Sequence, residues 1–124
     1  MKVYKFGGAS VRNAEGVRNL RHIVDGEENL FIIVSAMGKT TNALERVFSH
    51  MQKAETEAAN EEIKQIQAYH AEIIDELWGE HTDINEVTLL FGQLRNIVND
   101  IVYRHTDAEL WYDTIVAFGE LIST

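Results

Sequence analysis

The first 34 residues show a strand pattern, then a helical pattern, and then a second strand pattern. Apolar and polar side chains alternate over residues 2–6, which predicts a β-strand ending at a pair of glycines. Helical spacing follows and predicts an amphipathic helix that ends near Asp25, with its apolar positions at Ala14, Val17, Leu20 and Val24. The continuous apolar run at residues 30–34 predicts a second strand, buried on both faces as in a parallel sheet under helices. The three elements together predict a βαβ unit.

Beyond residue 42 the pattern predicts helices. Asn42, with Glu45, is expected to cap a helix whose apolar stripe includes Leu44 and Val47. Residues 54–60 are polar and alanine-rich, which predicts a loose connection or a continuation of that helix. Residues 61–78 predict a helix ended by Gly79, with its stripe at Ile63, Ile66, His70, Ile73, Ile74 and Leu77.

Two further helices are predicted, one over residues 84–102 and a shorter one capped by Asp107. Gly119 is expected to break that shorter helix, and Glu120 to begin a new one. The sequence stops within this last predicted helix, as expected for a truncated chain.

Composition narrows the class of protein. The chain has 124 residues, of which 45% are hydrophobic, enough for one modest domain with a core. Its net charge of −9 argues against nucleic acid or an anionic membrane surface as a partner. It has no cysteine, no signal-peptide pattern and no apolar run long enough to span a membrane, so we expect a cytoplasmic protein.

The first strand ends in residues suited to binding phosphate. Gly7 and Gly8 allow a sharp turn and the close approach of a ligand, and Ser10 is expected at the start of a helix, where free N–H groups favour an anion. Lys5 adds a positive charge near that turn. A tight connection without a ligand is the alternative interpretation of these residues.

The second predicted strand leads into Gly38-Lys39-Thr40, which is similar to part of a P-loop. A P-loop needs another glycine five residues before Gly38, and that position is Ile33, inside the strand. The P-loop is therefore excluded. Two strands ending in small, donor-rich loops still favour a ligand site at the carboxyl edge of the sheet.

Three segments together resemble the aspartate kinases. Residues 5–11, Lys-Phe-Gly-Gly-Ala-Ser-Val, match their K-F-G-G-T-S-V motif except that Ala9 replaces the threonine. Residues 34–42 resemble the V-S-A-x-x-x-x-T-N loop, and residues 118–123 resemble the G-E-x-x-S motif. The motifs occur in the family's order and extend over almost the whole chain.

The resemblance implies an α/β fold and a domain assignment. Residues 1–124 would be the N-terminal, amino-acid-binding portion of an aspartate kinase catalytic domain, with the carbamate kinase-like three-layer αβα fold that is helix-rich after residue 42. The rest of the kinase domain and the ACT regulatory domains would lie outside these residues. We expect this portion alone to be inactive and to expose a sheet edge, and the enzyme to form a homo-oligomer.

The resemblance also implies a reaction, the phosphorylation of L-aspartate by ATP and Mg²⁺ to 4-phospho-L-aspartate, the first step of lysine, threonine and methionine biosynthesis. By motif position, Lys5 would stabilise the transferring phosphoryl group. Ser35 would line the active site, Thr41 would bind aspartate, and Glu120 would bind its α-amino group. The motif residues at the ATP phosphates would be Gly7, Gly8 and Ser10. No metal ligands are visible in the sequence, and the lost hydroxyl at Ala9 would weaken nucleotide binding slightly.

Several alternatives remain open. Without the resemblance, Glu120 would be an acid at a helix N-terminus and Thr41 a helix-capping hydroxyl. His70 is expected to be a hydrogen-bonded core residue, and Trp78 and Trp111 are expected to pack against apolar neighbours. The chain could belong to another amino acid kinase or to a bifunctional aspartokinase–homoserine dehydrogenase. A non-catalytic helical interaction module is the alternative outside enzymes.

Overall fold

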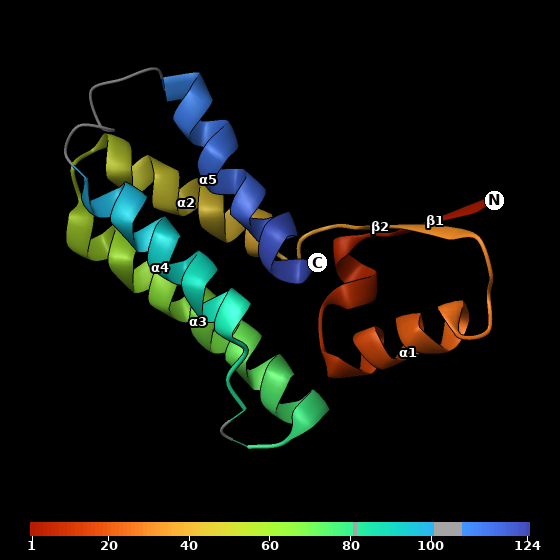
Figure 1. Ribbon diagram of the computed structural model, residues 1–124. Coiled ribbons are helices and arrows are strands. Elements are labelled where there is room, and N and C mark those ends of the chain that lie inside the picture. Colours follow the sequence, from red (N-terminus) through yellow and green to blue (C-terminus); the bar gives the residue numbers. More distant parts are fainter. Residues whose placement is uncertain (81, 101–107) are drawn as a thin grey trace.

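The computed structural model describes residues 1–80, 82–100 and 108–124. Two regions are visible in Figure 1, a small sheet with one helix and a bundle of longer helices. We call the first the sheet unit; it comprises β1 (Lys2–Phe6), the 3₁₀ helix η1 (Gly8–Val11), α1 (Ala14–Val24) and β2 (Leu30–Val34). The second, the helix bundle, comprises α2 (Thr40–Gln52), α3 (Thr56–Trp78), α4 (Asn85–Asn99) and α5 (Ala108–Ser123).

The predicted βαβ unit is confirmed. Strands β1 and β2 pair in parallel, with Lys5 opposite Ile33 and Phe6 opposite Val34. The interstrand ladder extends one residue further, because the amide N–H of Ser35 donates to the carbonyl oxygen of Phe6 at 3.0 Å. The two strands therefore end side by side.

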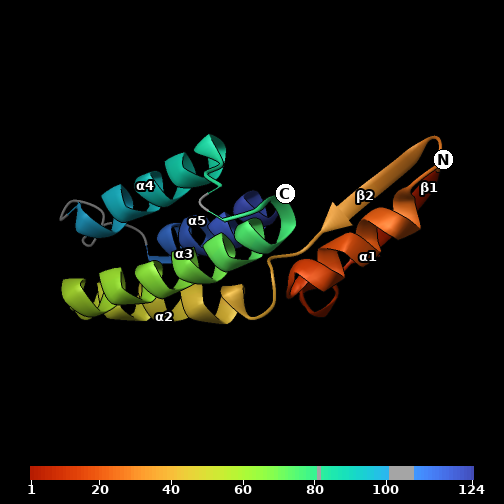
Figure 2. The same ribbon diagram turned by 90° about the horizontal axis from the view of Figure 1, so that it is seen from below.

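The prediction that β2 is buried on both faces is wrong. Phe31, Ile32 and Ile33 are 56%, 40% and 42% exposed. A strand is buried on both faces only when other elements cover both, and among the described elements α1 alone runs along this sheet (Figure 2). The apolar sequence of β2 therefore shows which residues favour burial, while the described chain supplies too few elements to bury them.

The start of α1 differs from the prediction at Ser10. Residues 8–11 form the 3₁₀ helix, and the α-helix begins three residues later, at Ala14. Asn13 caps it, because its side-chain oxygen accepts from the amide of Gly16 at 2.9 Å. The predicted C-terminal end of this helix, beside Asp25, is confirmed.

The helix bundle contains the main hydrophobic core. Its fully buried side chains come from all four helices, and the predicted stripes of α2 and α3 supply a large part of them. The largest of these buried residues are Phe91, Leu44, Ile63, Leu94 and Ile115. His70 lies at the edge of this core, only 3% exposed, with Nδ1 2.8 Å from the carbonyl oxygen of Ile66, as predicted.

Three predicted boundaries in the bundle are wrong. Helix α2 begins at Thr40 and not after a cap at Asn42, because its first backbone bond runs from the amide of Ala43 to the carbonyl oxygen of Lys39 at 3.2 Å. Helix α3 begins at Thr56, after a turn in which Ala54 has a φ of 57°. Helix α4 ends at Asn99, while the residues predicted to extend it (101–102) and the predicted cap at Asp107 lie outside the described residues.

Helix α5 is continuous through Gly119, which the sequence predicted as a break. A glycine is needed here because there is no room for a side chain, and not because the chain turns. A Cβ on Gly119 would lie 2.8 Å from the Cβ of Ala36 and 3.3 Å from Leu44. Glu120 therefore lies in the last turn of α5 and not at a helix N-terminus.

The two tryptophans differ from each other. Trp78, at the end of α3, is 62% exposed, so the prediction that it packs against apolar neighbours is wrong. Trp111 is half-buried in α5. The part of the chain that the structure describes includes no helix with the length and apolar character needed to cross a membrane.

Candidate functional site

The loop that joins the two regions brings the three motif segments together. We call residues 35–39, between β2 and α2, the junction loop. The amide of Gly38 in this loop donates to the carbonyl oxygen of Gly8 at 3.0 Å. The first motif therefore lies directly against the second, as expected where two parallel strands end side by side.

Gly8 is required by this contact. A Cβ at this position would lie 2.7 Å from the carbonyl oxygen of Gly38 and 3.0 Å from that of Ala36. Both atoms belong to the backbone, so neither can move aside cheaply. Gly7 has open space around it, with no atom within 4 Å of where its Cβ would be. One glycine thus packs the two loops together and the other leaves the turn accessible.

The third motif reaches the junction loop from α5. Gly119 is buried, and its backbone packs on Ala36 of the loop and on Thr40, the first residue of α2. Figure 1 shows the C-terminal end of α5 beside this loop. The three motif segments therefore contact one another at the junction loop, through Gly8, Ala36 and Gly119.

The predicted site residues surround this meeting point with different exposure. Lys5, Gly7, Ser10 and Glu120 are exposed, while Gly8, Ser35 and Thr41 are half-buried. Lys5 forms no ion pair or side-chain hydrogen bond with another described residue, so its ammonium group is available to a ligand. The side chains of Ser10 and Glu120 are likewise unbonded within the described ranges, and their roles are taken up under the proposed function.

Comparison with known proteins identifies the fold family. The family model described as amino acid kinase family matches residues 1–124. The chain belongs to the amino acid kinase family. It is 30% identical over 126 residues to aspartokinase 1, chloroplastic, of Arabidopsis thaliana, and 32% identical over 132 residues to aspartokinase 2, chloroplastic, of the same plant. Each alignment covers 98% of this chain, which spans 22% and 23% of the two relatives.

Solved structures have the same fold. Aspartokinase III of E. coli, in complex with aspartate and ADP, superposes with a TM-score of 0.80 at 22% identity. The aspartate kinase of Clostridium acetobutylicum gives 0.73 at 21% identity. The superpositions cover 99% and 98% of this chain and 27% of each of those chains. The predicted α/β fold of the amino acid kinase family is therefore confirmed.

The amino acid kinase fold here also forms a cleft that the sequence did not indicate. It has a volume of about 520 Å³ and lies between η1, the junction loop, α2 and α3. None of the seven predicted residues lines it, but their neighbours Ala9, Gly38 and Thr40 do. Its charged lining residues are Arg12, Lys39, Arg46 and Glu62.

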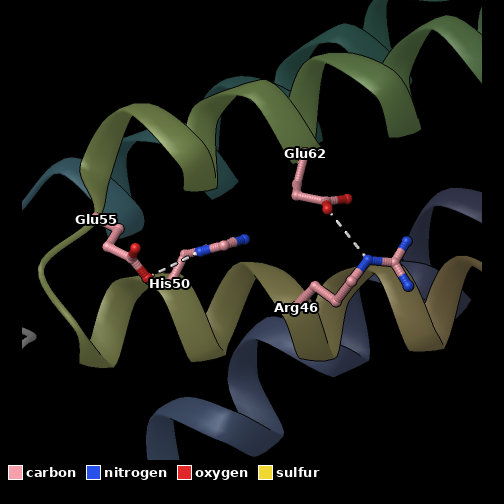
Figure 3. A network of polar contacts seen from close by, with 4 residues as sticks. All are labelled: Arg46, His50, Glu55 and Glu62. Carbon is pink, nitrogen blue, oxygen red and sulfur yellow. Dashed lines mark hydrogen bonds and ion pairs between the residues drawn. The ribbon is translucent and has the colours of Figure 1, made fainter.

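Cationic residues dominate this cleft, although the chain is acidic overall. Three of its four charged lining residues are basic, and one of them, Arg46, is bonded through Nε to the carboxylate of Glu62 at 3.1 Å (Figure 3). Figure 3 also shows the 3.1 Å contact between His50 and Glu55, at the other end of α2. Arg12 and Lys39 each follow a predicted turn. Their positive charge is the feature of the sequence from which this cleft could have been predicted.

Tyr69 connects the wall of the cleft to the sheet unit. Its hydroxyl, on α3, donates to the backbone carbonyl of Arg12. Burial raises the pKa of the Tyr69 phenol more than the nearby Arg12 guanidinium lowers it, so the hydroxyl keeps its proton. Arg18 on α1 adds a second connection, to the carbonyl of Glu76.

The predicted nucleotide loop fits phosphate on its backbone geometry. Gly8 and Ala9 begin η1, and the first amides of a helix have no acceptor within it. The open space at Gly7 and the exposed Lys5 lie beside them. Within the described residues no three His, Cys, Asp or Glu side chains cluster so as to hold a metal ion.

Proposed function

We propose that this protein is an aspartate kinase, which transfers the γ-phosphoryl group of ATP to the side-chain carboxylate of L-aspartate. The observation that carries the proposal is the convergence of Gly8, Ala36 and Gly119, one from each motif, at the junction loop. The named relatives, and the neighbour that binds aspartate and ADP, support the choice of substrate. The full activity also rests on chain outside these residues, because the relatives are four to five times longer.

The reaction forms one bond and breaks one bond. An oxygen of the aspartate side-chain carboxylate attacks the γ-phosphorus, the bond to the β,γ-bridging oxygen breaks, and ADP leaves with the electron pair. No proton needs to be removed from the nucleophile, because a carboxylate is already ionised at neutral pH. The requirement is therefore positioning and positive charge rather than a general base.

The chain supplies groups suited to both requirements. Lys5 places a cation at the end of β1, where we assign it to the phosphoryl group in transfer. The amides of Gly7 and Gly8 and the hydroxyl of Ser10 are assigned to the ATP phosphates. Mg²⁺, bound with ATP, would neutralise part of the phosphate charge.

The amino acid would be held from the other side of the junction loop. Ser35 and Thr41, at the end of β2 and in the first turn of α2, supply hydroxyl groups for the substrate. The carboxylate of Glu120 is suited to the α-ammonium group, because a charge-assisted hydrogen bond is the stronger kind. Its position in the last turn of α5 removes the alternative in which it stabilises a helix N-terminus.

The test uses the natural gene product extended to its own stop codon. MgATP and L-aspartate are supplied, and the acyl phosphate is trapped with hydroxylamine as aspartyl hydroxamate. We expect Lys5→Met to lower kcat by about 10²- to 10³-fold, the usual effect of removing one preorganised charge stabiliser. Glu120→Gln should raise the KM for aspartate by roughly tenfold or more, because a charged hydrogen bond is lost.

Matched controls separate these roles from a general effect of charge. Lys64→Met and Glu72→Gln change exposed residues of α3 and should leave both constants unchanged. If the folded wild-type protein makes no hydroxamate from aspartate but makes one from another amino acid, the substrate is wrong and another amino acid kinase is indicated. If it neither binds nucleotide nor depends on Lys5, the helical interaction module is the better description.

The position in metabolism and the assembly follow from the same proposal. The product, 4-phospho-L-aspartate, would enter lysine, threonine and methionine biosynthesis in the cytoplasm. We also propose a homo-oligomer, because apolar side chains of β2 are exposed and unpaired strand edges favour association. An assay of the same gene product for homoserine dehydrogenase activity distinguishes a monofunctional aspartate kinase from a bifunctional aspartokinase–homoserine dehydrogenase.

A further inference from the structure

The segment that we assign to the ATP phosphates is anchored to the junction loop at its beginning. We call residues 7–12, which include η1 and the residue after it, the phosphate loop. Just before this loop, the carbonyl oxygen of Phe6 accepts from the amide of Ser35 at 3.0 Å. Within it, the carbonyl oxygen of Gly8 accepts from the amide of Gly38, also at 3.0 Å. Both anchors are bonds between backbone groups of two neighbouring strand ends.

The other end of the phosphate loop is anchored by a side chain of α3. The hydroxyl group of Tyr69 donates to the carbonyl oxygen of Arg12, the residue that follows η1. Burial raises the pKa of the Tyr69 phenol, so the hydroxyl group keeps its proton and remains a donor at neutral pH. This bond therefore joins the end of the phosphate loop, in the sheet unit, to a long helix of the bundle.

The same hydroxyl group also lies against the junction loop. Gly38 has a φ of 55°, and a Cβ on it would lie 2.6 Å from the hydroxyl oxygen of Tyr69. The hydroxyl group thus occupies the space that a side chain at position 38 would need. One oxygen atom of α3 therefore borders both of the loops that meet at the proposed nucleotide site.

The position of the phosphate donors decides how well they can stabilise the group in transfer. Donors that are already oriented cost no reorganisation during the reaction, whereas a loop that must first be ordered consumes binding free energy. Ser10, whose hydroxyl group we assign to the phosphates, lies two residues before Arg12, so a shift at Arg12 would move it. The side chain of Val11 is 1% exposed and also holds the loop, so the loss of one bond should weaken nucleotide binding without abolishing it.

We propose that Tyr69 is a positioning residue for the nucleotide: its hydroxyl group, bonded to the carbonyl oxygen of Arg12, holds the phosphate loop in the geometry that receives the ATP phosphates. Tyr69 acts through the loop and does not itself contact the substrates. The inference rests on the proposed kinase function and extends it to a residue that lies outside the three motifs.

The experiment removes the hydroxyl group alone, in Tyr69→Phe of the natural full-length gene product. The dissociation constant for ADP is measured by calorimetry without aspartate, and the kinetic constants are measured by the hydroxamate assay. We expect the dissociation constant for ADP to rise, and kcat/KM for MgATP to fall, by roughly three- to tenfold, the range that one net hydrogen bond gives. The KM for aspartate should not change.

Two controls separate the positioning of the loop from a general loss of stability. Tyr112→Phe also removes one hydroxyl group, which donates to the carboxylate of Glu45 at 2.8 Å between α5 and α2. Arg18→Met removes another bond between the sheet unit and α3, the one to the carbonyl oxygen of Glu76, and leaves the phosphate loop untouched. Both variants should keep the wild-type affinity for ADP and both KM values, whatever they do to the melting temperature.

A measurement on the unsubstituted protein decides the question if Tyr69→Phe does not fold. The ¹³Cζ resonance of Tyr69 should shift on addition of ADP, and that of Tyr112 should not. Wild-type affinity for ADP in folded Tyr69→Phe, an equal loss in Arg18→Met, or an unshifted Tyr69 resonance would overturn the proposal. Wild-type protein that binds ADP but makes no hydroxamate would overturn the proposed reaction, and the ADP affinities would still decide the role of Tyr69. Wild-type protein that binds no ADP would overturn both.

Discussion

The helix bundle and the sheet unit are built from similarly apolar sequence but reach very different states of burial. Every residue of the main core cluster belongs to α2, α3, α4 or α5. The sheet unit buries Phe6, Val11 and Ala14, yet leaves Val3 and most of β2 exposed. The bundle can satisfy its apolar stripes internally, because each helix faces another helix (Figure 1).

Hydrophobic pattern and burial are therefore separate properties of a segment. A continuous apolar run predicts a strand correctly, but its burial depends on what other chain covers the sheet. An exposed apolar strand beside an unpaired edge is a surface on which further chain or a second copy can pack.

The largest contrast should come from truncating one apolar residue in each region. Phe91→Ala, in the centre of the bundle core, should lower the free energy of unfolding by about 3–5 kcal/mol, because it leaves a cavity. Ile32→Ala on β2 should cost less than about 1 kcal/mol, because its side chain is already substantially exposed. Urea denaturation of residues 1–124 measures both.

A large loss of stability in Ile32→Ala would contradict this difference between the two regions. It would mean that β2 is covered in solution, and a dependence of that effect on protein concentration would identify a second copy as the cover. Analytical ultracentrifugation of the same samples would show whether the associated species is lost in Ile32→Ala. A monomer with a small Ile32 effect would instead count against the proposed homo-oligomer for this part of the chain.

The next prediction concerns the contact between the bundle and the junction loop. Gly119→Ala should destabilise the protein by about 1–3 kcal/mol, because the added Cβ would lie 2.8 Å from that of Ala36. Gly92→Ala in α4 is the matched control, since no atom lies within 4 Å of its added Cβ. That change should stabilise the protein by about 0.5–1 kcal/mol through helix propensity. Thermal unfolding of both variants gives the sign, and equal signs would contradict the packing role of Gly119.

A smaller effect is expected within the sheet unit, at the cap of α1. Asn13→Ala removes the side-chain oxygen that accepts from Gly16 and should cost about 1 kcal/mol. Asn19→Ala, at an exposed position inside the same helix, should be neutral or slightly stabilising. Hydrogen exchange of the α1 amides resolves the difference, and identical protection in the two variants would mean that the cap contributes nothing.

The smallest contribution to stability at neutral pH should come from the ionisation of His70. This contribution should change as the pH falls. Its folded-state pKa lies below the ordinary 6.5, so the unfolded chain binds the proton more readily. Stability from this residue is therefore complete above about pH 6.5 and is lost as the pH falls from there toward the lowered folded pKa. Chemical denaturation from pH 7.5 to 5 should show a steeper acid loss in wild type than in His70→Phe. Glu86 and His70 both line a cavity between α3, α4 and α5, so Glu86→Gln controls for the charge of Glu86.

Most of the fold could be predicted from the sequence because its signals are local. Helical spacing located α1 and the apolar stripes of α2 and α3. An alternating run located β1, and a continuous apolar run located β2. Boundaries failed where a capping residue type does not mark the helix start, as with Asn42, which lies inside α2 while Lys39 is the N-cap without a side-chain bond. Gly119 failed for a related reason, since a glycine that permits close packing and one that ends a helix have the same local sequence signal.

The candidate site could be predicted at the level of its segments but not of its surroundings. Strand ends and the resemblance placed residues around Gly8, Ser35 and Glu120 in one neighbourhood, and the backbone contacts at the junction loop agree. The cationic cleft was missed because Arg12 and Arg46 are far apart in sequence and have no common motif. The roles assigned to individual side chains remain predictions for the kinetic tests.

The position of the junction loop has a consequence for heat inactivation. The loop joins two regions that are also linked, among the described residues, by polar contacts made by Tyr69 and Arg18. Mild heating should loosen the fit of one region against the other before either loses its helices. The proposed kinase activity of the natural gene product would then be lost at a lower temperature than that at which circular dichroism reports melting, and it would return at once on cooling.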